Sequence, residues 1–379
     1  MLIINAKIYT LEGKIIEQGY VNTFGNRIVD VGDMNDLGGY DCQFFDVGGQ
    51  VICPGFIDIH THLGIIEDSL CFEGDDANED TDPVTPELRA IDAINPYDKA
   101  FLESVRSGVT SVVVSAGSAN PIAGQMVLLK TAGNCIDEMI VDPYVAMKFA
   151  LGENPKNVYN SKNQTPATRM ATTALIRESL FKTQQYMQKK EEDEMPDFEM
   201  KYEALIPVLK REVQAHFHAH RADDIFTAIR IAKEFDLDLV LVHATEAYMV
   251  ADKVRDIPMI IGPFLTDRSK PELANLSLEA PKILAENNVL FSISTDHPET
   301  PLKFLDLCAS VAIREGLSFE KALECITINP AKIIGADDKI GSIKKGKHAD
   351  LVILSGEPFQ NSTKVTYTMI NGVLKSCEK

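Results

Sequence analysis

The sequence lacks the positive charge that two classes of partner require. Lysine and arginine number 37 against 56 aspartate and glutamate residues, a formal net charge of −19. A nucleic-acid backbone and an anionic membrane surface both bind basic patches, and we find no basic patch along the chain. We therefore expect neither of these partners. The sequence leaves self-association into a homo-oligomer open.

Long apolar runs and paired cysteines are also missing. No stretch approaches the roughly 20 apolar residues of a membrane-spanning helix, and the first residues do not have the pattern of a secretory leader. The seven cysteines form no C-x-x-C pair and no compact framework. We expect them to be reduced, mostly buried thiols, which are typical of a cytosolic protein, and we therefore expect a cytoplasmic location.

The two ends of the chain have a similar β-rich character that differs from the middle. Short apolar runs broken by glycine fill the first 46 residues, and a comparable pattern returns after Ala349, with an Asn371-Gly372 pair typical of a hairpin turn. We interpret residues 1–53 and 345–379 as one small β-sandwich domain formed from both termini. Residues 54–344 then fold as a single inserted unit.

The middle of the chain alternates between strand-like and helical patterns. Near-continuous apolar strands alternating with helices indicate a parallel sheet that is buried on both faces. The fold class that we predict is α/β, with residues 54–344 forming a (β/α)₈ TIM-like barrel. The predicted strands are Val51 to His60, Thr110 to Ser115, Tyr144 to Leu151, Val213 to His218, Asp238 to His243, Pro258 to Gly262 and Val289 to Thr295, with an eighth at Met126 to Lys130.

Histidines concentrate at the ends of these strands. His60 and His62 are two residues apart on one strand, so their side chains point to the same side and can converge on one metal ion. A single pair of this kind is more often structural. However, His218 and His220 close the fourth predicted strand and His243 the fifth, so three strand ends hold five of the eight histidines. In a barrel of parallel strands these ends meet at one rim.

Asp296 closes the last predicted strand and completes this set of polar groups. Imidazole and carboxylate are suitable ligands for zinc and related divalent ions. His216 lies about 7 Å deeper along its strand than His218, where a buried structural histidine is the more common case. The sequence therefore predicts a divalent metal site that gathers residues far apart in the chain.

A set of short motifs runs along the chain: PGFIDIHTH from Pro54, LGENPK from Leu151, HAHRADDI from His218, VH ending at His243, STD ending at Asp296, NPAKIIG from Asn329 and GSIKKGKHADLVIL from Gly341. Together these motifs resemble those of the amidohydrolase superfamily, and within it the imidazolonepropionase-related metal-dependent amidohydrolases. The resemblance spans essentially the whole chain.

The resemblance implies a set of metal ligands and a bridging group. His60, His62 and Asp296 would hold one divalent ion, and His218 with His243 a second ion where the site is binuclear. Zinc is the expected metal, although other divalent metals fit the same ligands. Members of the superfamily often bridge two ions with a carboxylated lysine, and Lys148 fits this role because a buried lysine has a lowered pKa. Glu153 is the alternative bridging carboxylate.

The resemblance also implies a reaction, the hydrolysis of an amide or cyclic amide C–N bond in a small molecule. Asp296 would serve as general acid and base. If one ion is bound, His243 and His218 are free to polarise the substrate carbonyl. We expect His220, Glu153 and Arg221 to contact the substrate. The alternatives that stay open are a dipeptidase of the Xaa-Pro type, a deaminase of a nitrogen heterocycle and a catalytically inactive barrel scaffold.

Overall fold

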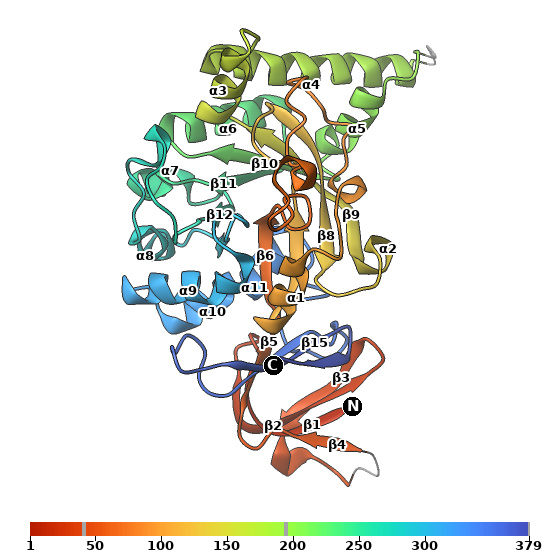
Figure 1. Cartoon of the computed structure of the whole chain (residues 1–379), viewed down its shortest axis with the longest axis vertical. Coiled ribbons are helices and arrows are strands. Elements are labelled where there is room, and N and C mark those ends of the chain that lie inside the picture. The colour runs from red at the N-terminus through yellow and green to blue at the C-terminus, as the bar shows by residue number, and fades with distance from the viewer. Residues whose placement is uncertain (40–42, 193–195, 378–379) are drawn as a thin grey trace.

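The computed structural model describes residues 1–39, 43–192 and 196–377, and it contains two sheets of eight strands each (Figure 1). The first sheet joins both ends of the chain. Its central order is β16-β15-β14-β5-β1-β2-β3, and β4 pairs with β1. Its strands are β1 (Leu2–Tyr9), β2 (Ile15–Phe24), β3 (Arg27–Asp33), β4 (Phe44–Asp46), β5 (Val51–Pro54), β14 (Leu351–Leu354), β15 (Val365–Ile370) and β16 (Val373–Ser376).

The predicted hairpin near the C-terminus is confirmed. Strands β15 and β16 pair antiparallel across a two-residue turn at Asn371 and Gly372, whose φ angles are +50° and +78°. Positive φ at both positions is the conformation that an Asn-Gly turn favours. Both chain ends therefore lie in one sheet below the second sheet in Figure 1. The domain limits at residues 53 and 345 stay a prediction.

The second sheet is a nearly closed barrel, as the sequence predicts. Its strands follow each other in chain order from β6 to β13. Most run as buried apolar segments, because helices and loops cover the outside and side chains fill the inside. The strands are β6 (Phe56–Thr61), β7 (Val109–Val114), β8 (Ile122–Lys130), β9 (Ile140–Ala150), β10 (Gln214–Ala219), β11 (Leu239–His243), β12 (Met259–Ile261) and β13 (Phe291–Ile293).

Strand β8 departs from the all-parallel sheet that we expected. It pairs antiparallel with both β7 and β9, whereas every other neighbouring pair in this sheet is parallel. A parallel pair needs a crossover connection of about a dozen residues or more. Only residues 115–121 separate β7 from β8, and only residues 131–139 separate β8 from β9, so both connections reverse the chain.

Asp58 joins the first and last strands of the barrel. Strands β6 and β13 are not neighbours in the hydrogen-bonded order. Instead, the fully buried carboxylate of Asp58 accepts hydrogen bonds at 2.8 and 2.7 Å from the backbone N–H and hydroxyl of Thr295, just after β13. The hydroxyl of Ser294 donates to the carbonyl of His60 at 2.7 Å. These bonds hold the two strand ends that carry His60 and Asp296 side by side.

Helices cover the barrel, and α6 shows why they form. Its apolar residues recur at the helical period, and the helix packs this buried face against β10 and β11. Acidic residues occupy its first turn. The helices are α1 (Lys99–Arg106), α2 (Ile136–Met139), α3 (Glu153–Ser161), α4 (Arg169–Glu191), α5 (Met200–Leu209), α6 (Ala222–Phe235), α7 (Ala251–Val254), α8 (Ala280–Glu286), α9 (Leu305–Arg314), α10 (Phe319–Cys325) and α11 (Ile328–Ile333). Shorter 3₁₀ turns are η1 (Met34–Asp36), η2 (Cys71–Gly74), η3 (Ala90–Asp92), η4 (Ala247–Val250), η5 (Pro271–Leu273) and η6 (Leu302–Phe304).

The cysteines are less uniformly buried than we expected. The described ones are all unpaired: Cys53, Cys308 and Cys325 are buried, Cys71 and Cys135 are exposed, and Cys377 is intermediate. Cys42 falls outside the described residues. A search of the described helices finds none with both the length and the apolar character needed to cross a membrane.

Candidate metal centre

His60, His62 and Asp296 come together at one rim of the barrel. The Nε2 atoms of His60 and His62 lie 3.3 and 3.4 Å from the same carboxylate oxygen of Asp296, Oδ1. Asp296 has a φ of +51°, an uncommon backbone conformation for a residue other than glycine. This arrangement of two imidazoles and one carboxylate matches the first predicted ligand set.

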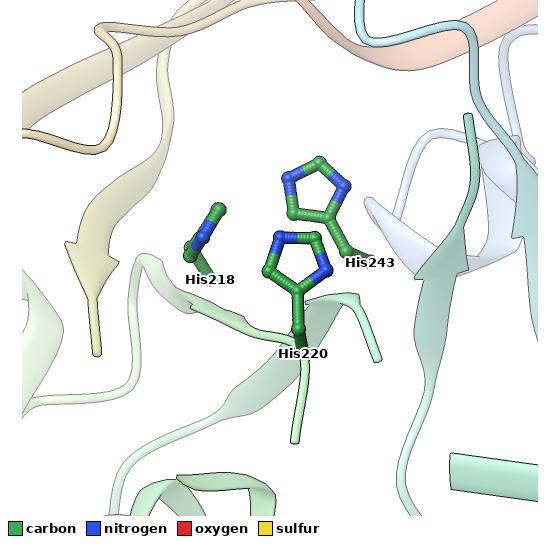
Figure 2. Close-up of side chains that lie close together, drawn as sticks. All are labelled: His218, His220 and His243. Atoms are coloured by element: carbon green, nitrogen blue, oxygen red, sulfur yellow. The ribbon is translucent and has the colours of Figure 1, made fainter. Parts of the chain in front are cut away.

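A second group contains His218, His220 and His243, which come from the ends of β10 and β11 (Figure 2). One candidate ligand atom from each lies within 4.8 Å of the other two. His218 Nδ1 lies 2.9 Å from Ser118 Oγ, and His220 Nδ1 lies 2.7 Å from Thr245 Oγ1. His243 Nδ1 lies 2.8 Å from the Gly262 carbonyl oxygen. Such outer contacts fix the ring orientations and leave the Nε2 atoms for a ligand.

The two groups adjoin each other. His243 Nε2 lies 3.9 Å from Asp296 Oδ2, and the His60 and His243 ring centroids are 5.2 Å apart. His243 has a φ of +66°, so the two residues that link the groups both have left-handed backbone conformations. Backbone strain of this kind is found most often at functional sites.

Lys148 is positioned for the predicted bridging role, whereas Glu153 is not. The Lys148 side chain is fully buried, its Nζ is 3.3 Å from His60 Nε2, and burial lowers its pKa to about 7. Glu153 lies in the first turn of α3, where its Oε2 accepts a hydrogen bond from the Glu272 N–H at 3.2 Å. Of the two residues predicted as the bridging group, the geometry favours Lys148 over Glu153.

The charge states suit a cation. Burial lowers the pKa of His243 to about 4 and the pKa values of His60, His218 and His220 well below their ordinary value, which keeps these rings neutral. Burial alone would raise the pKa of Asp296, but the neighbouring imidazoles lower it well below its ordinary value. Neutral imidazole and ionised carboxylate are the forms that bind divalent metals.

Unpartnered polar atoms provide a test of whether the residues fit a metal ion. Among the described residues, neither His220 Nε2 nor Asp296 Oδ1 has a hydrogen-bond partner, although both atoms are buried. Ligand atoms around a tetrahedral zinc ion, with bonds of about 2.0–2.1 Å, lie roughly 3.3–3.5 Å apart. The 3.3 and 3.4 Å separations around Asp296 Oδ1 agree with this spacing. The residues therefore fit a divalent cation.

A cavity of about 380 Å³ opens onto both groups. His62, His218, His220, His243 and Asp296 line it, so the predicted contact of His220 with a substrate is geometrically possible. Arg221 is not in its lining. Arg221 is exposed, forms an ion pair with Asp223 at 2.9 Å and borders a neighbouring cavity of about 240 Å³ together with Glu153. The predicted substrate contacts of Arg221 and Glu153 are thus not supported by this cavity.

Three residues near the site are absent from the sequence-based predictions. Glu272 in η5 is 1% exposed, and its Oε1 lies 3.8 and 3.5 Å from the Nε2 atoms of His218 and His220. Lys270 and Asn154 line the cavity beside it. All three follow strand ends, Asn154 after β9 and the other two after β12, and Asn154 also belongs to the LGENPK motif. His216 lies outside both groups, with Nε2 3.2 Å from Gln214 Oε1.

Comparisons with known proteins show which family and which solved structures the chain is similar to. A model of the amidohydrolase family matches residues 51–375. The chain is 41% identical to a crystal structure of an amidohydrolase from Thermotoga maritima MSB8, with a TM-score of 0.95 and 98% of each chain covered. The amidohydrolase tasK of Hapsidospora irregularis is 26% identical over 88% of this chain, which spans only 37% of that protein's length. An imidazolonepropionase of Porphyromonas gingivalis is 24% identical, over 92% of this chain and 85% of that protein.

Proposed function

Because the chain belongs to the amidohydrolase family, we propose that it is a metal-dependent hydrolase that cleaves an amide or cyclic amide C–N bond in a small molecule. The resemblance in the sequence motifs is thereby confirmed at the level of the family. The proposal rests on one observation. Two groups of candidate metal ligands adjoin at Asp296, and both contribute to the wall of one cavity of about 380 Å³. A volume of this size is typical of small-molecule sites.

We assign the ligands as follows. His60, His62 and Asp296 would hold one divalent ion, and His218 with His243 would hold a second, with carboxylated Lys148 as the proposed bridging ligand. Zinc is the proposed metal, because imidazole-rich sites with a carboxylate suit zinc. When bound, a divalent ion supplies Lewis acidity, which activates water and polarises a carbonyl group.

The chain's own residues transfer the proton. Asp296 is held ionised among imidazoles, so it can accept a proton from the attacking water. It then delivers that proton to the nitrogen that leaves, which prevents expulsion of an unstable amide anion. His220 lines the cavity with an unpartnered Nε2, where it can contact the carbonyl side of the substrate.

A substrate panel tests the proposal. Protein loaded with zinc is incubated with hydantoin-like rings, N-acyl amino acids, Xaa-Pro dipeptides and nitrogen heterocycles, and released amine or ammonia is measured. We expect turnover of an amide or cyclic amide, its loss after chelation and its return when zinc is added. Activity that persists in fully metal-free protein would contradict the proposed chemistry. Release of ammonia from a heterocycle alone would identify a deaminase instead.

Two matched substitutions test the bridging residue. We expect Lys148→Met to lower the number of bound ions, measured by elemental analysis after gel filtration. Glu153→Gln serves as the control, because Glu153 faces Glu272 rather than the histidines. A loss of metal in the Glu153 variant with none in the Lys148 variant would reverse the assignment.

A further inference from the structure

Lys270 gives the cavity an unusual charged group. It is the one lysine or arginine among the described residues that line the cavity, and its side chain is 28% exposed. It lies in the loop after β12, directly before η5. A few polar or charged groups in the wall of a small-molecule cavity fix the orientation of the ligand.

A buried carboxylate holds this ammonium in place. Glu272 Oε1 lies 3.0 Å from Lys270 Nζ, and Glu272 is 1% exposed. Glu272 is itself fixed by a reciprocal pair of hydrogen bonds: the Glu153 N–H donates to Glu272 Oε2 at 3.1 Å, and the Glu272 N–H donates to Glu153 Oε2 at 3.2 Å. These two hydrogen bonds form a Glu153–Glu272 clasp, which joins the loop after β12 to the first turn of α3. The clasp thereby fixes the position of Lys270 at the cavity wall.

Asn154 places a second donor beside the first. Its Oδ1 accepts a hydrogen bond from Lys270 Nζ at 3.3 Å, which turns its amide nitrogen toward the site, 3.5 Å from His218 Nε2. This last distance is at the limit of a hydrogen bond, so the amide donors are available to a ligand. An ammonium has three donors, and Glu272 and Asn154 occupy two of them.

From this geometry we infer that Lys270 and Asn154 form a subsite for a carboxylate group of the substrate, next to the bond that is cleaved. The inference rests on the proposed function and narrows it to amides that carry a carboxylate near the scissile bond, as N-acyl amino acids do. The subsite also explains the Gly152-Glu153-Asn154 segment of the LGENPK motif: Glu153 fixes the clasp and Asn154 faces the ligand.

Matched ligands test the subsite by ligand-observed NMR, which reports binding and hydrolysis together. The probes are N-acetyl-L-amino acids and N-acetyl amines of identical side chain that lack the carboxylate, with zinc-loaded full-length protein. We expect wild type to bind the acids at least about tenfold more tightly than the amines, because a hydrogen bond to a charged group is worth that much or more. In Lys270→Met the ratio should fall to about one, with amine binding little changed.

Three further variants make the result specific. Lys270→Arg keeps the charge and should retain most of the preference. Lys156→Met removes another lysine of the same motif, which borders the neighbouring cavity instead, and should leave the ratio unchanged. Lys270→Gln replaces Lys270→Met if the methionine variant does not fold, because it keeps a donor for Glu272.

Two outcomes would overturn the inference: equal binding of acids and amines to wild type, or a preference that survives in Lys270→Met. The proposed function fails separately. If the preference depends on Lys270 but no probe is hydrolysed, carboxylate recognition stands without the reaction. Hydrolysis of both ligand series with equal efficiency would support the reaction and reject the subsite.

Discussion

Lys148 shows how a single buried residue connects stability to the proposed chemistry. Its Nζ lies 3.3 Å from His60 Nε2 with no exposed surface, and burial lowers its pKa from 10.5 to about 7. Near neutral pH a large fraction of the side chain is the free amine, and the free amine is the form that can react with carbon dioxide to give a carbamate. An exposed lysine is almost entirely protonated at the same pH.

This pKa also predicts a pH-dependent stability. Between pH 7 and 10.5 the unfolded chain binds the Lys148 proton and the metal-free folded chain does not, so stability rises with pH across this range. Below pH 7 the folded state has the full unfavourable contribution of a buried ammonium. We expect metal-free Lys148→Met to be more stable than metal-free wild type at pH 6, by on the order of 5 kcal/mol, with the gain shrinking above pH 7.

Urea unfolding at pH 6, 8 and 10 measures this effect. Lys345→Met, at an exposed position, is the control and should give no comparable gain. Equal stability of Lys148→Met and wild type at pH 6 would mean that water or a carboxylate compensates the buried ammonium. The same variant should bind fewer metal ions, so its stability and its metal content should change in opposite senses.

The sequence predicts part of this site at residue level. His60, His62, His218, His243 and Asp296 are predictable because they close strands, and strand ends meet at one rim. Glu272 and Lys270 are not, because the loop after β12 has no periodicity and a surface ion pair is the more common role for such residues. Glu272 differs from the other acidic residues in its position beside His218 and His220, which only the three-dimensional structure reveals.

At the scale of elements, the junction between β9 and α3 depends on Gly152. Its φ is +82°, and a Cβ at this position would lie 2.8 Å from Glu272 Oε2. Both the backbone conformation and the close approach require glycine here. Gly13 has almost the same φ, +79°, but a Cβ there would meet nothing within 4 Å.

Both glycines have a positive φ, and the ψ of −140° at Gly152 adds a backbone conformation that other residues rarely adopt. We expect Gly13→Ala to show only the backbone strain, about 1 kcal/mol of lost stability. Gly152→Ala should lose more, and it should also disturb the Glu153–Glu272 clasp and so weaken binding of carboxylate ligands. Thermal melting and the ligand-observed NMR assay measure the two effects. Similar losses for both variants would show that the contact with Glu272 has no role.

The direction of β8 is the main element-level feature that the sequence does not reveal. A run of apolar residues predicts a strand at Met126 to Lys130, and a strand is present at Ile122–Lys130. Apolar content does not encode direction, because parallel and antiparallel strands buried on both faces have the same pattern. The connections on both sides of β8 are shorter than a parallel crossover needs, so their length is the feature that indicates an antiparallel strand.

At the scale of the whole molecule, a buried ion pair connects the two sheets. Lys130, at the end of β8, and Asp350, just before β14, are 1% and 5% exposed at their side chains and bond to each other directly. Asp350 also accepts a hydrogen bond from the Asn371 N–H at 2.9 Å, and its carbonyl accepts one from the Gly55 N–H at 3.0 Å. The pair therefore fixes the barrel against the sheet formed by the chain ends.

Removal of one partner of this ion pair should lower the stability of the protein more than removal of both. We expect Lys130→Met to cost about 3–5 kcal/mol, because it leaves the Asp350 charge buried and uncompensated. The double variant Lys130→Met with Asp350→Asn should recover part of that loss. Guanidinium unfolding of the single and double variants measures the coupling. A Lys130→Met variant as stable as wild type would show that solvent reaches this junction.

The overall architecture is largely predictable from the sequence. Alternating strand and helix patterns indicate the barrel, and β-rich ends indicate a shared sheet, because an inserted barrel brings both ends together. The buried contacts between the two sheets, such as Lys130 with Asp350, are not predictable, since they join residues more than 200 positions apart with no local pattern.

We propose that residues far apart in the sequence hold a divalent cation at one rim of the barrel. Anomalous diffraction at the zinc edge, from crystals of protein purified without chelator and supplied with zinc, tests it most directly. We expect an anomalous peak about 2.0–2.2 Å from His60 Nε2, His62 Nε2 and an Asp296 carboxylate oxygen. Crystals of hydrolytically active protein with no peak among these three residues would contradict it.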